Sequence, residues 1–462
     1  MTRTTKHLLV LLLSHALAAL LNKRSHGGAT VAVPGSLMRN DILVAPDLVD
    51  HDRERSEARG QGLEPRMTGP KPAVLPITPP PKGAAPKGEA DRTRTSGMSP
   101  RPLSAIVLAA GEGTRMHSSR PKPLHLLCGR AMVLYVLDSL AGCEVGRAVV
   151  VVGHGAERVT KKLLDAAPDV PLEFVEQEVQ RGTGDAVGVA LTAFSSDELD
   201  DVNADIIVLP GDTPLLRAET ISALLATHQS TDAACTLLTA RVSDPTGYGR
   251  IVRGRDDRVD RVVEQADASE AQLAITEVNT SIYCFRASVL GPALRRITPE
   301  NAQGEYYLTD VVEVLASAGY RVSAVVAEDA LDTTGVNDRL QLAAAEMELR
   351  RRTNEAWMRK GVTMVDPGRT YVDTTVRLDA DVTLFPDTIL QGSCVIGAGT
   401  ELGPNTRLVD CRVGARSVVE NSVGRGADIG DDVRLGPFAV LEPGAVVSDG
   451  ARPGPFYTSP SE

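Results

Sequence analysis

Short aliphatic runs alternate with stretches of helical periodicity between residues 103 and 212. The aliphatic runs are LSAIVLAA, RAVVVVGH, LEFVEQ and DIIVLPGD, and the helical stretches include AMVLYVLDSLAG and GTGDAVGVALTAF. Strands that alternate with helices predict a doubly wound α/β fold with a mostly parallel sheet. Ligands of such sheets bind beyond the carboxyl ends of the strands. In this chain those ends carry the Gly111 loop, Gln177, Gly211 and Asp212.

The segment from residue 234 to residue 286 is richer in strand patterns, with ACTLLTARV, GRIVRG, VDRVVEQ and EVNTSIYCF in succession. We expect an antiparallel insertion there that walls a substrate pocket. The segment 337–360 is helical in pattern and leads out of this domain.

After residue 370 the periodicity changes to one aliphatic residue in every six. These residues are Val372, Leu378, Leu384, Leu390, Ile396, Leu402 and Leu408 and, after a break around Val413, Val423, Ile429, Leu435, Leu441 and Val447. Hexapeptide periodicity with small corner residues predicts a β-helix in which these side chains point inward. Ordinary hairpins would instead alternate with period two. At three hexads a coil, we expect about four coils.

The composition limits which classes of protein this chain can belong to. A chain of 462 residues suits two or three domains. The net charge of -11 disfavours a nucleic-acid or anionic-membrane surface, so any bound phosphate needs a local site. The six cysteines form no CxxC pair, which indicates reduced thiols and a cytoplasmic protein.

The first hundred residues follow none of these patterns. Arg3 and Lys6 precede an interrupted apolar run that resembles a secretory signal but is too short for a confident membrane span. The following Pro- and Gly-rich sequence predicts disorder. Because Met98 begins a compact lead into the first strand, we hypothesise that residues 1–97 are an upstream extension. A mature native chain that begins well before Met98 would contradict this hypothesis.

The stretch LAAGEGTRMHSSRPKPLH, residues 108–125, combines a strand end with two glycines and several basic residues. Gly111 and Gly113 let backbone N–H groups approach a ligand, and a helix beginning nearby would add its positive end. Arg115 and Lys122 supply compensating charge, so we predict a site for a di- or triphosphate. A GxG alone also fits a simple tight turn. The spacing matches neither GxGxxG nor GxxxxGK[ST], which disfavours Rossmann dinucleotide and P-loop sites.

This stretch closely resembles the LAAGxGTRMxSxxPKxLH signature of sugar-nucleotide pyrophosphorylases. Further segments match in family order, namely EQEVQRGTGDAV, LPGDTPLL, DPTGYGRIV, VVEQADA, EVNTSIY, ENAQGEYYLTD and GVNDRLQL. Together with the hexapeptide repeats, the chain from about Pro102 to Pro443 resembles the bacterial bifunctional enzymes that acetylate glucosamine-1-phosphate and then uridylylate the product to UDP-N-acetylglucosamine. The resemblance implies a Rossmann-like nucleotidyltransferase domain followed by a short left-handed parallel β-helix.

The patterns and the resemblance together divide the chain into five parts. We expect a disordered extension at 1–100, a nucleotidyltransferase domain at 101–336, a helical linker at 337–362, a truncated β-helix at 363–450 and a tail at 451–462.

The resemblance also implies a role for each residue of the site. Arg115 and Lys122 would be catalytic, neutralising the phosphates and the departing pyrophosphate. Asp212 and Asn337 would bind Mg²⁺ through oxygen atoms. The nucleotide would be bound by Leu108, Ala109, Ala110, Gly111, Gln177, Gly182 and Thr183, with a bidentate amide from Gln177 and a hydroxyl contact from Thr183 to the uracil base. The sugar would be bound by Gly249, Glu264 and Asn279.

The implied reaction joins UTP and N-acetylglucosamine-1-phosphate. The attacking phosphate monoester is already an anion, so we expect in-line displacement at the α-phosphorus without a general base or a covalent intermediate. The family also implies a homotrimer assembled through the β-helix. We expect neither nucleic acid nor membrane as a partner.

Several residues depart from the family pattern. Asp185 stands where the family has His, and Glu442 in FAVLEPGA stands where the pattern FxxLRPGA has Arg. No counterpart of the catalytic His or the acetyl-CoA groove precedes ARPGPFYTSPSE, so we predict no acetyltransferase activity. Two alternatives stay open, which are another sugar-1-phosphate nucleotidyltransferase and an inactive remnant or scaffold. Singly, Lys122, Asp212 and Asn337 would suit a surface or a helix cap, and only their motifs raise the functional interpretation.

Overall fold

The computed structural model describes residues 101–459. The predicted signal-like start and extension at 1–100, and the last three residues of the predicted tail, lie outside this range. Within it, every helix is too short or too polar to cross a lipid bilayer.

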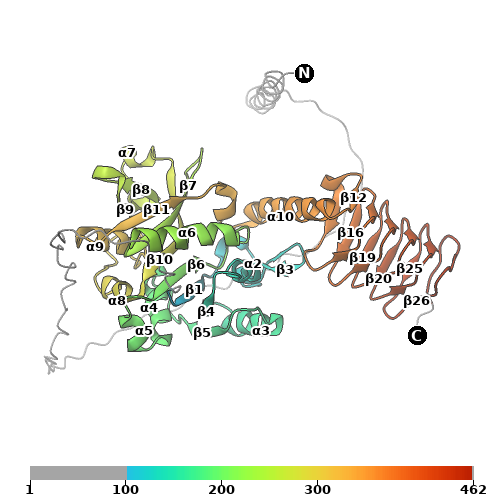
Figure 1. The fold of residues 1–462 in the computed structure, drawn as a ribbon, viewed down its shortest axis with the longest axis horizontal. Coiled ribbons are helices and arrows are strands. Elements are labelled where there is room, and N and C mark those ends of the chain that lie inside the picture. Colours follow the sequence, from blue (N-terminus) through green and yellow to red (C-terminus); the bar gives the residue numbers. More distant parts are fainter. Residues whose placement is uncertain (1–100, 460–462) are drawn as a thin grey trace, which may run out of the picture. The chain divides into compact units, whose positions relative to one another are not determined.

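The first domain is built on one large sheet whose main path runs β11-β7-β10-β6-β1-β4-β5 (Figure 1). The four predicted strands form and pair in parallel, as β1 (Leu103–Ala109), β4 (Val145–Val152), β5 (Leu172–Glu176) and β6 (Asp205–Pro210). Their continuous Val, Ile and Leu runs suit strands buried on both faces. The predicted α/β class is therefore confirmed.

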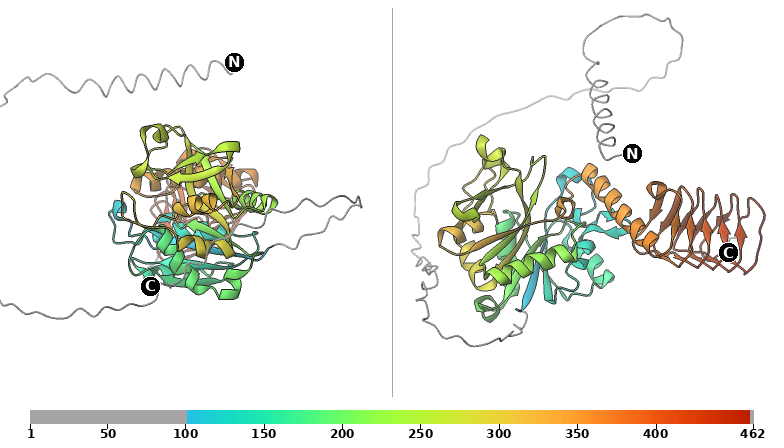
Figure 2. Two further views of the ribbon diagram at one scale, coloured as in Figure 1. Left: turned by 90° about the vertical axis from the view of Figure 1, so that its left-hand side faces the viewer. Right: turned by 45° about the horizontal axis from the view of Figure 1, so that its top comes forward.

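Helices cover both faces of this sheet, as the two views of Figure 2 show. Ile106, Val149 and Val208 pack on one face against α4 (Thr183–Ala190), α8 (Ala287–Leu294) and α9 (Asp310–Ser317). Val107, Val150 and Ile207 pack on the other face against α2 (Met132–Asp138), α3 (Ala156–Ala166) and α6 (Ala218–Thr231). Alternate residues of each strand thus fill two separate cores. The remaining short elements are β2 (Leu126–Leu127), β3 (Arg130–Ala131), α5 (Ser196–Asp200) and α7 (Glu270–Leu273).

The expected antiparallel insertion is wrong in part. β7 (Cys235–Arg241) and β10 (Glu277–Arg286) belong to the central sheet, with β10 antiparallel to both β6 and β7. β11 (Val322–Val326) joins parallel to β7. Only β8 (Arg250–Arg253) and β9 (Val259–Val263) form an antiparallel extension, paired through β10. A strand pattern shows that a segment is extended and buried but does not show its neighbour in the sheet.

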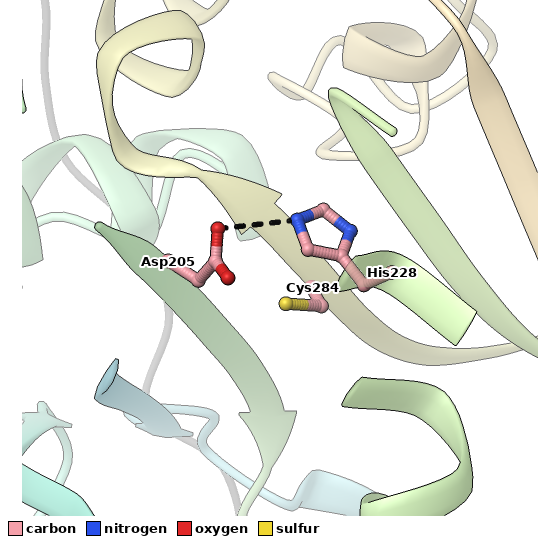
Figure 3. Close-up of side chains that lie close together, drawn as sticks. All are labelled: Asp205, His228 and Cys284. Atoms are coloured by element: carbon pink, nitrogen blue, oxygen red, sulfur yellow. Dashed lines mark ion pairs between the residues drawn. The ribbon is translucent and has the colours of Figure 1, made fainter. Parts of the chain in front are cut away.

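A buried polar cluster stands at the amino end of β6 (Figure 3). Asp205 Oδ1 lies 3.3 Å from His228 Nε2, and His228 Nδ1 lies 2.8 Å from the hydroxyl of Thr236. Cys284 lies beside this pair, and these three ligand types could hold a metal ion. However, the guanidinium of Arg101 lies 3.7 Å from the same carboxylate oxygen and already counters its charge. We therefore assign Asp205 and His228 as a buried pair that ties α6 to the sheet.

The helix predicted at 337–360 is confirmed as α10 (Arg339–Arg359). Asp338 caps it, because its carboxylate accepts the backbone N–H of Gln341 at 2.8 Å. At its far end Asn354, which is buried, donates to the carbonyls of Pro367 and Thr370 in the first coil that follows.

The hexapeptide region is a stack of coils with three five-stranded parallel sheets, which confirms the β-helix architecture (Figure 1). The first sheet contains β12 (Thr363–Met364), β15 (Thr383–Leu384), β18 (Glu401–Leu402), β21 (Val418–Val419) and β24 (Arg434–Leu435). The second contains β13 (Thr370–Val372), β16 (Thr388–Gln391), β19 (Arg407–Val409), β22 (Val423–Arg425) and β25 (Val440–Leu441). The third contains β14 (Arg377–Leu378), β17 (Val395–Ile396), β20 (Arg412–Val413), β23 (Asp428–Ile429) and β26 (Val446–Val447).

The expectation of about four coils is too low, because each sheet has five strands. The predicted inward positions leave out Met364, ahead of the first regular hexad, and Val413 and Val419 at the break, all of which are buried. A 3-10 turn at Pro367–Arg369 separates Met364 from Val372 and breaks the six-residue step.

One predicted inward position is also wrong. Val423 is 51% exposed, whereas Gly424 is buried and pairs in register with Leu408 and Leu441. The inward residues through the break are Leu408, Val413, Val419, Gly424 and Ile429, so several steps are five residues long. Where a corner is one residue shorter, the step between inward residues is five. This changes which residue of the following strand points inward.

Candidate active site

One cavity of about 470 Å³ opens at the carboxyl ends of β1 and β6. Every predicted site residue lines it, namely Leu108, Ala109, Ala110, Gly111, Arg115, Lys122, Gln177, Gly182, Thr183, Asp212, Gly249, Glu264, Asn279 and Asn337. The structure thus brings the whole predicted set around one cavity, while the role of each residue stays a prediction.

The loop after β1 is shaped by its glycines. A side chain on Gly111 would meet nothing within 4 Å, so this stretch of backbone is open to a ligand. Gly113 has a φ of 65°, and a Cβ there would lie 2.7 Å from Cβ of Lys122. The expected helix beginning nearby is wrong, because Thr114–Met116 form only a 3-10 turn and α2 starts at Met132. Positive charge at the loop therefore comes from side chains rather than from a helix end.

Lys122 is the centre of a polar cluster that joins three distant parts of the chain. Its ammonium donates to the carboxylate of Asp212 and to Oδ1 of Asn337, the latter at 2.8 Å. Arg115 also donates to Oδ1 of Asn337, at 3.0 Å. The backbone N–H of Val336 donates to the carbonyl of Asp212 at 2.8 Å, which keeps the two oxygen-bearing residues side by side.

Asp212 and Asn337 are suited to bind a hard divalent cation. One ammonium contacts both side-chain oxygens, so a single cation can also contact both. Mg²⁺ prefers oxygen ligands and takes few of them from protein when phosphate and water complete its shell. The donor set therefore fits Mg²⁺.

The predicted nucleotide-base end lies at the end of β5 and the start of α4. The backbone N–H of Gln177 donates to Val152 O at 2.8 Å and anchors the residue. The side-chain Nε2 of Gln177 donates to Gly182 O at 3.2 Å and to Asp185 Oδ2 at 2.8 Å. The hydroxyl of Thr183 accepts the backbone N–H of Leu308 at 3.1 Å. Both N–H bonds of Gln177 thus have protein partners in this structure, and the bidentate contact of its amide with a base stays a prediction.

The predicted sugar end lies under the β8–β9 hairpin. Gly249 accepts the backbone N–H of Asn279 at 2.9 Å, and a Cβ at Gly249 would lie 3.3 Å from both carboxylate oxygens of Glu264. Burial raises the pKa of Glu264, whose carboxylate accepts the hydroxyl of Thr309 at 3.1 Å. The Asn279 amide donates to Tyr283 at 2.7 Å. These contacts hold the wall of the cavity at this end.

Sequence reasoning missed some of the residues that line the cavity. Gln180 donates from Nε2 to Ala110 O at 2.6 Å and so links the base end to the Gly111 loop. Tyr248, Thr213 and Glu305 also line the cavity. Gln180 and Tyr248 stand inside the motifs EQEVQRGTGDAV and DPTGYGRIV, so membership of a motif was the available signal.

Comparison with known proteins places this geometry in a family. The model of the nucleotidyl transferase family matches residues 104–358. The bifunctional protein GlmU of Streptomyces coelicolor is 46% identical over 357 residues, which cover 77% of this chain and 73% of that protein. The GlmU protein of Thermobifida fusca is 47% identical over 330 residues, covering 71% and 68%, and that of Halalkalibacterium halodurans is 43% identical over 352 residues, covering 76% and 75%. The predicted resemblance is confirmed, and the chain belongs to the nucleotidyl transferase family, among the bifunctional GlmU proteins.

Proposed function

We propose that this chain transfers a uridylyl group from UTP to N-acetylglucosamine-1-phosphate, releasing pyrophosphate and forming UDP-N-acetylglucosamine for cell-wall precursor synthesis. The observation that carries the proposal is one cavity lined by the Gly111 loop, by the Lys122, Asp212 and Asn337 cluster, and by Gly249, Glu264 and Asn279. Membership of the family supports the same activity.

The side chains of the cavity align the two substrates and neutralise their charge. Arg115 and Lys122 face the triphosphate and stabilise the negative charge that grows on the departing pyrophosphate. The phosphate of the sugar attacks the α-phosphorus in line. Because this phosphate is already an anion, alignment replaces a general base.

Mg²⁺ is the proposed cofactor, and Asp212 and Asn337 would hold it. When bound, the ion supplies Lewis-acid stabilisation of phosphate oxygens. Lys122, whose ammonium contacts the same two oxygens, would then turn with Arg115 toward the phosphates of the substrates.

The decisive experiment measures pyrophosphate release from UTP and Mg²⁺ with N-acetylglucosamine-1-phosphate. Glucose-1-phosphate is run in parallel, since another sugar-1-phosphate is the rival substrate. Selective release with the N-acetylated sugar supports the proposal. Faster release with glucose-1-phosphate would instead support the rival activity. No release of pyrophosphate by a folded protein would support an inactive remnant or scaffold.

We further propose a homotrimer that forms through the β-helix. Tyr371, Val423 and Val440 stand on the same five-stranded sheet and are 41%, 51% and 41% exposed. The strand register places them in one row with Ile389 and the exposed Arg407 between Tyr371 and Val423. Exposed apolar side chains repeated along one sheet are suited to association with copies of the chain. Light scattering coupled to size-exclusion chromatography measures the assembly, and a monomeric mass would overturn this part of the proposal.

The proposed location is the cytoplasm. All six cysteines are free, and five of them are buried, which suits a reducing compartment.

A further inference from the structure

Asp185 lies next to the nucleotide-base end without lining the cavity. It occupies the first turn of α4, and its only side-chain hydrogen bond within residues 101–459 is the one that it accepts from Gln177. We infer that Asp185 is a positioning residue that fixes the orientation of the Gln177 carboxamide, so that the site accepts pyrimidines with an N–H at N3 and rejects cytosine. The inference rests on the proposed function.

The first step concerns the two ends of the carboxamide. An amide NH₂ has two hydrogens to donate. In Gln177 one goes to Asp185 Oδ2 at 2.8 Å and the other to Gly182 O at 3.2 Å. Gln177 lines the cavity. Within residues 101–459, no N–H or hydroxyl donates to its Oε1, and this oxygen is not among the fully buried polar atoms, so it is accessible to a ligand. The group presented to a ligand is therefore an acceptor.

The second step is that the carboxamide cannot reverse. An ionised carboxylate and a backbone carbonyl are both acceptors only. Reversal would place Oε1 of Gln177 against Asp185 Oδ2 and Gly182 O, losing both hydrogen bonds and bringing lone pairs together. The carbonyl of Gly182 is itself held by the backbone, because Gly182 has a φ of 109° and a Cβ there would lie 2.6 Å from Tyr306 O.

The third step is the chemistry of the base. Uracil carries an N–H donor at N3, whereas cytosine carries an acceptor at N3 beside an amine. A fixed acceptor at Oε1 pairs with N3–H of uracil but faces a lone pair of cytosine. A histidine, as in the family pattern at this position, can donate or accept according to its tautomer and would not impose one orientation. Asp185 is thus a specificity determinant through Gln177.

The experiment measures kcat/KM and equilibrium affinity for UTP and for CTP in the wild type and in Asp185 variants. Asp185→Leu removes the acceptor, so the UTP-to-CTP ratio should fall by about 10- to 100-fold while kcat with UTP changes little. Asp185→Asn keeps an acceptor oxygen and should retain most of the ratio. Asp197→Leu changes an exposed acidic residue in the first turn of α5 and serves as the matched control.

An unchanged ratio in a folded Asp185→Leu protein, or a wild type that does not discriminate UTP from CTP, would overturn the inference. If the leucine variant does not fold, Asp185→Ala repeats the test without added bulk. If the wild type does not turn over, the proposed function fails, but the ratio of UTP to CTP affinities from titration calorimetry still decides the role of Asp185.

Discussion

At the residue scale, the cavity is organised by a single ammonium group. Lys122 contacts oxygen atoms that come from the end of β6 and from the residue just before the cap of α10. Its charge compensates Asp212, and the shared contact keeps Asn337 beside that carboxylate. The contacts among Lys122, Asp212 and Asn337 therefore hold the three side chains in place before a substrate binds.

Replacing Asp212 by alanine tests the proposed cation pair. The variant removes one of two oxygen ligands and the only charged one, so Mg²⁺-dependent pyrophosphate release should be abolished. Circular dichroism should show a retained fold, and Asp197→Ala should keep wild-type activity. Unchanged turnover in Asp212→Ala would remove this residue from the mechanism.

The pair of Asp205 and His228 allows a second prediction. His228→Ala should lower the free energy of unfolding by about 3–5 kcal/mol, because a buried carboxylate loses a partner. Urea unfolding measures this change. The control His154→Ala, at an exposed position, should change the free energy of unfolding by less than about 0.5 kcal/mol. An equally small change in His228→Ala would contradict the prediction and show that Arg101 alone compensates the charge of Asp205.

At the element scale, much of the fold could be predicted because periodicity reports burial. The parallel strands, α10 and the β-helix follow from it, and since the carboxyl ends of parallel strands converge, the motif residues there gather in one cavity. The contact of Asp185 with Gln177 and the pairing of β7 with β10 could not be predicted. Both depend on packing between segments, which hydrophobic spacing does not encode.

The inward position in β22 offers a test of the corrected register. A Cβ at Gly424 would lie 3.1 Å from Cδ2 of Leu408 and 3.4 Å from Sγ of Cys411. Gly424→Val should therefore destabilise the β-helix by about 1–3 kcal/mol through overpacking. Val423→Thr, on the exposed side, should cost less than about 0.5 kcal/mol in chemical unfolding. A larger loss of stability in Val423→Thr than in Gly424→Val would show that Val423 is the inward residue after all.

The start of α9 gives the chain a pH-dependent stability. Burial, with Glu313 and Asp267 nearby, raises the pKa of Asp310 from 3.8 to about 6. The fold thus favours the neutral carboxyl, so this contribution is complete below about pH 4 and is lost as pH rises through about 6. Asp310→Asn should be more stable than the wild type at pH 8, with the advantage vanishing near pH 4. Urea unfolding of both proteins at pH 4 and pH 8 measures this advantage. An equal difference in the free energy of unfolding at the two pH values would contradict the prediction.

At the scale of the whole molecule, two kinds of architecture share one chain, and its similar relatives are named bifunctional proteins. The absence of acetyltransferase activity stays a prediction, supported by the exposed Glu442, whose carboxylate would repel a sugar phosphate where the family pattern has Arg. Glucosamine-1-phosphate with acetyl-CoA should therefore release no free thiol above the rate without enzyme. Sustained release of coenzyme A would contradict the prediction.

The position of Asn337 has a consequence beyond binding. Its neighbour Val336 donates a backbone N–H to the carbonyl of Asp212, just after β6. Its own backbone N–H donates to the side-chain Oε1 of Gln341, in the first turn of α10, at 2.7 Å. These two hydrogen bonds help to keep the oxygens of the proposed cation pair together. We therefore expect a change that loosens the first turn of α10 to move Asn337 away from Asp212 and to lower the activity while the central sheet stays intact.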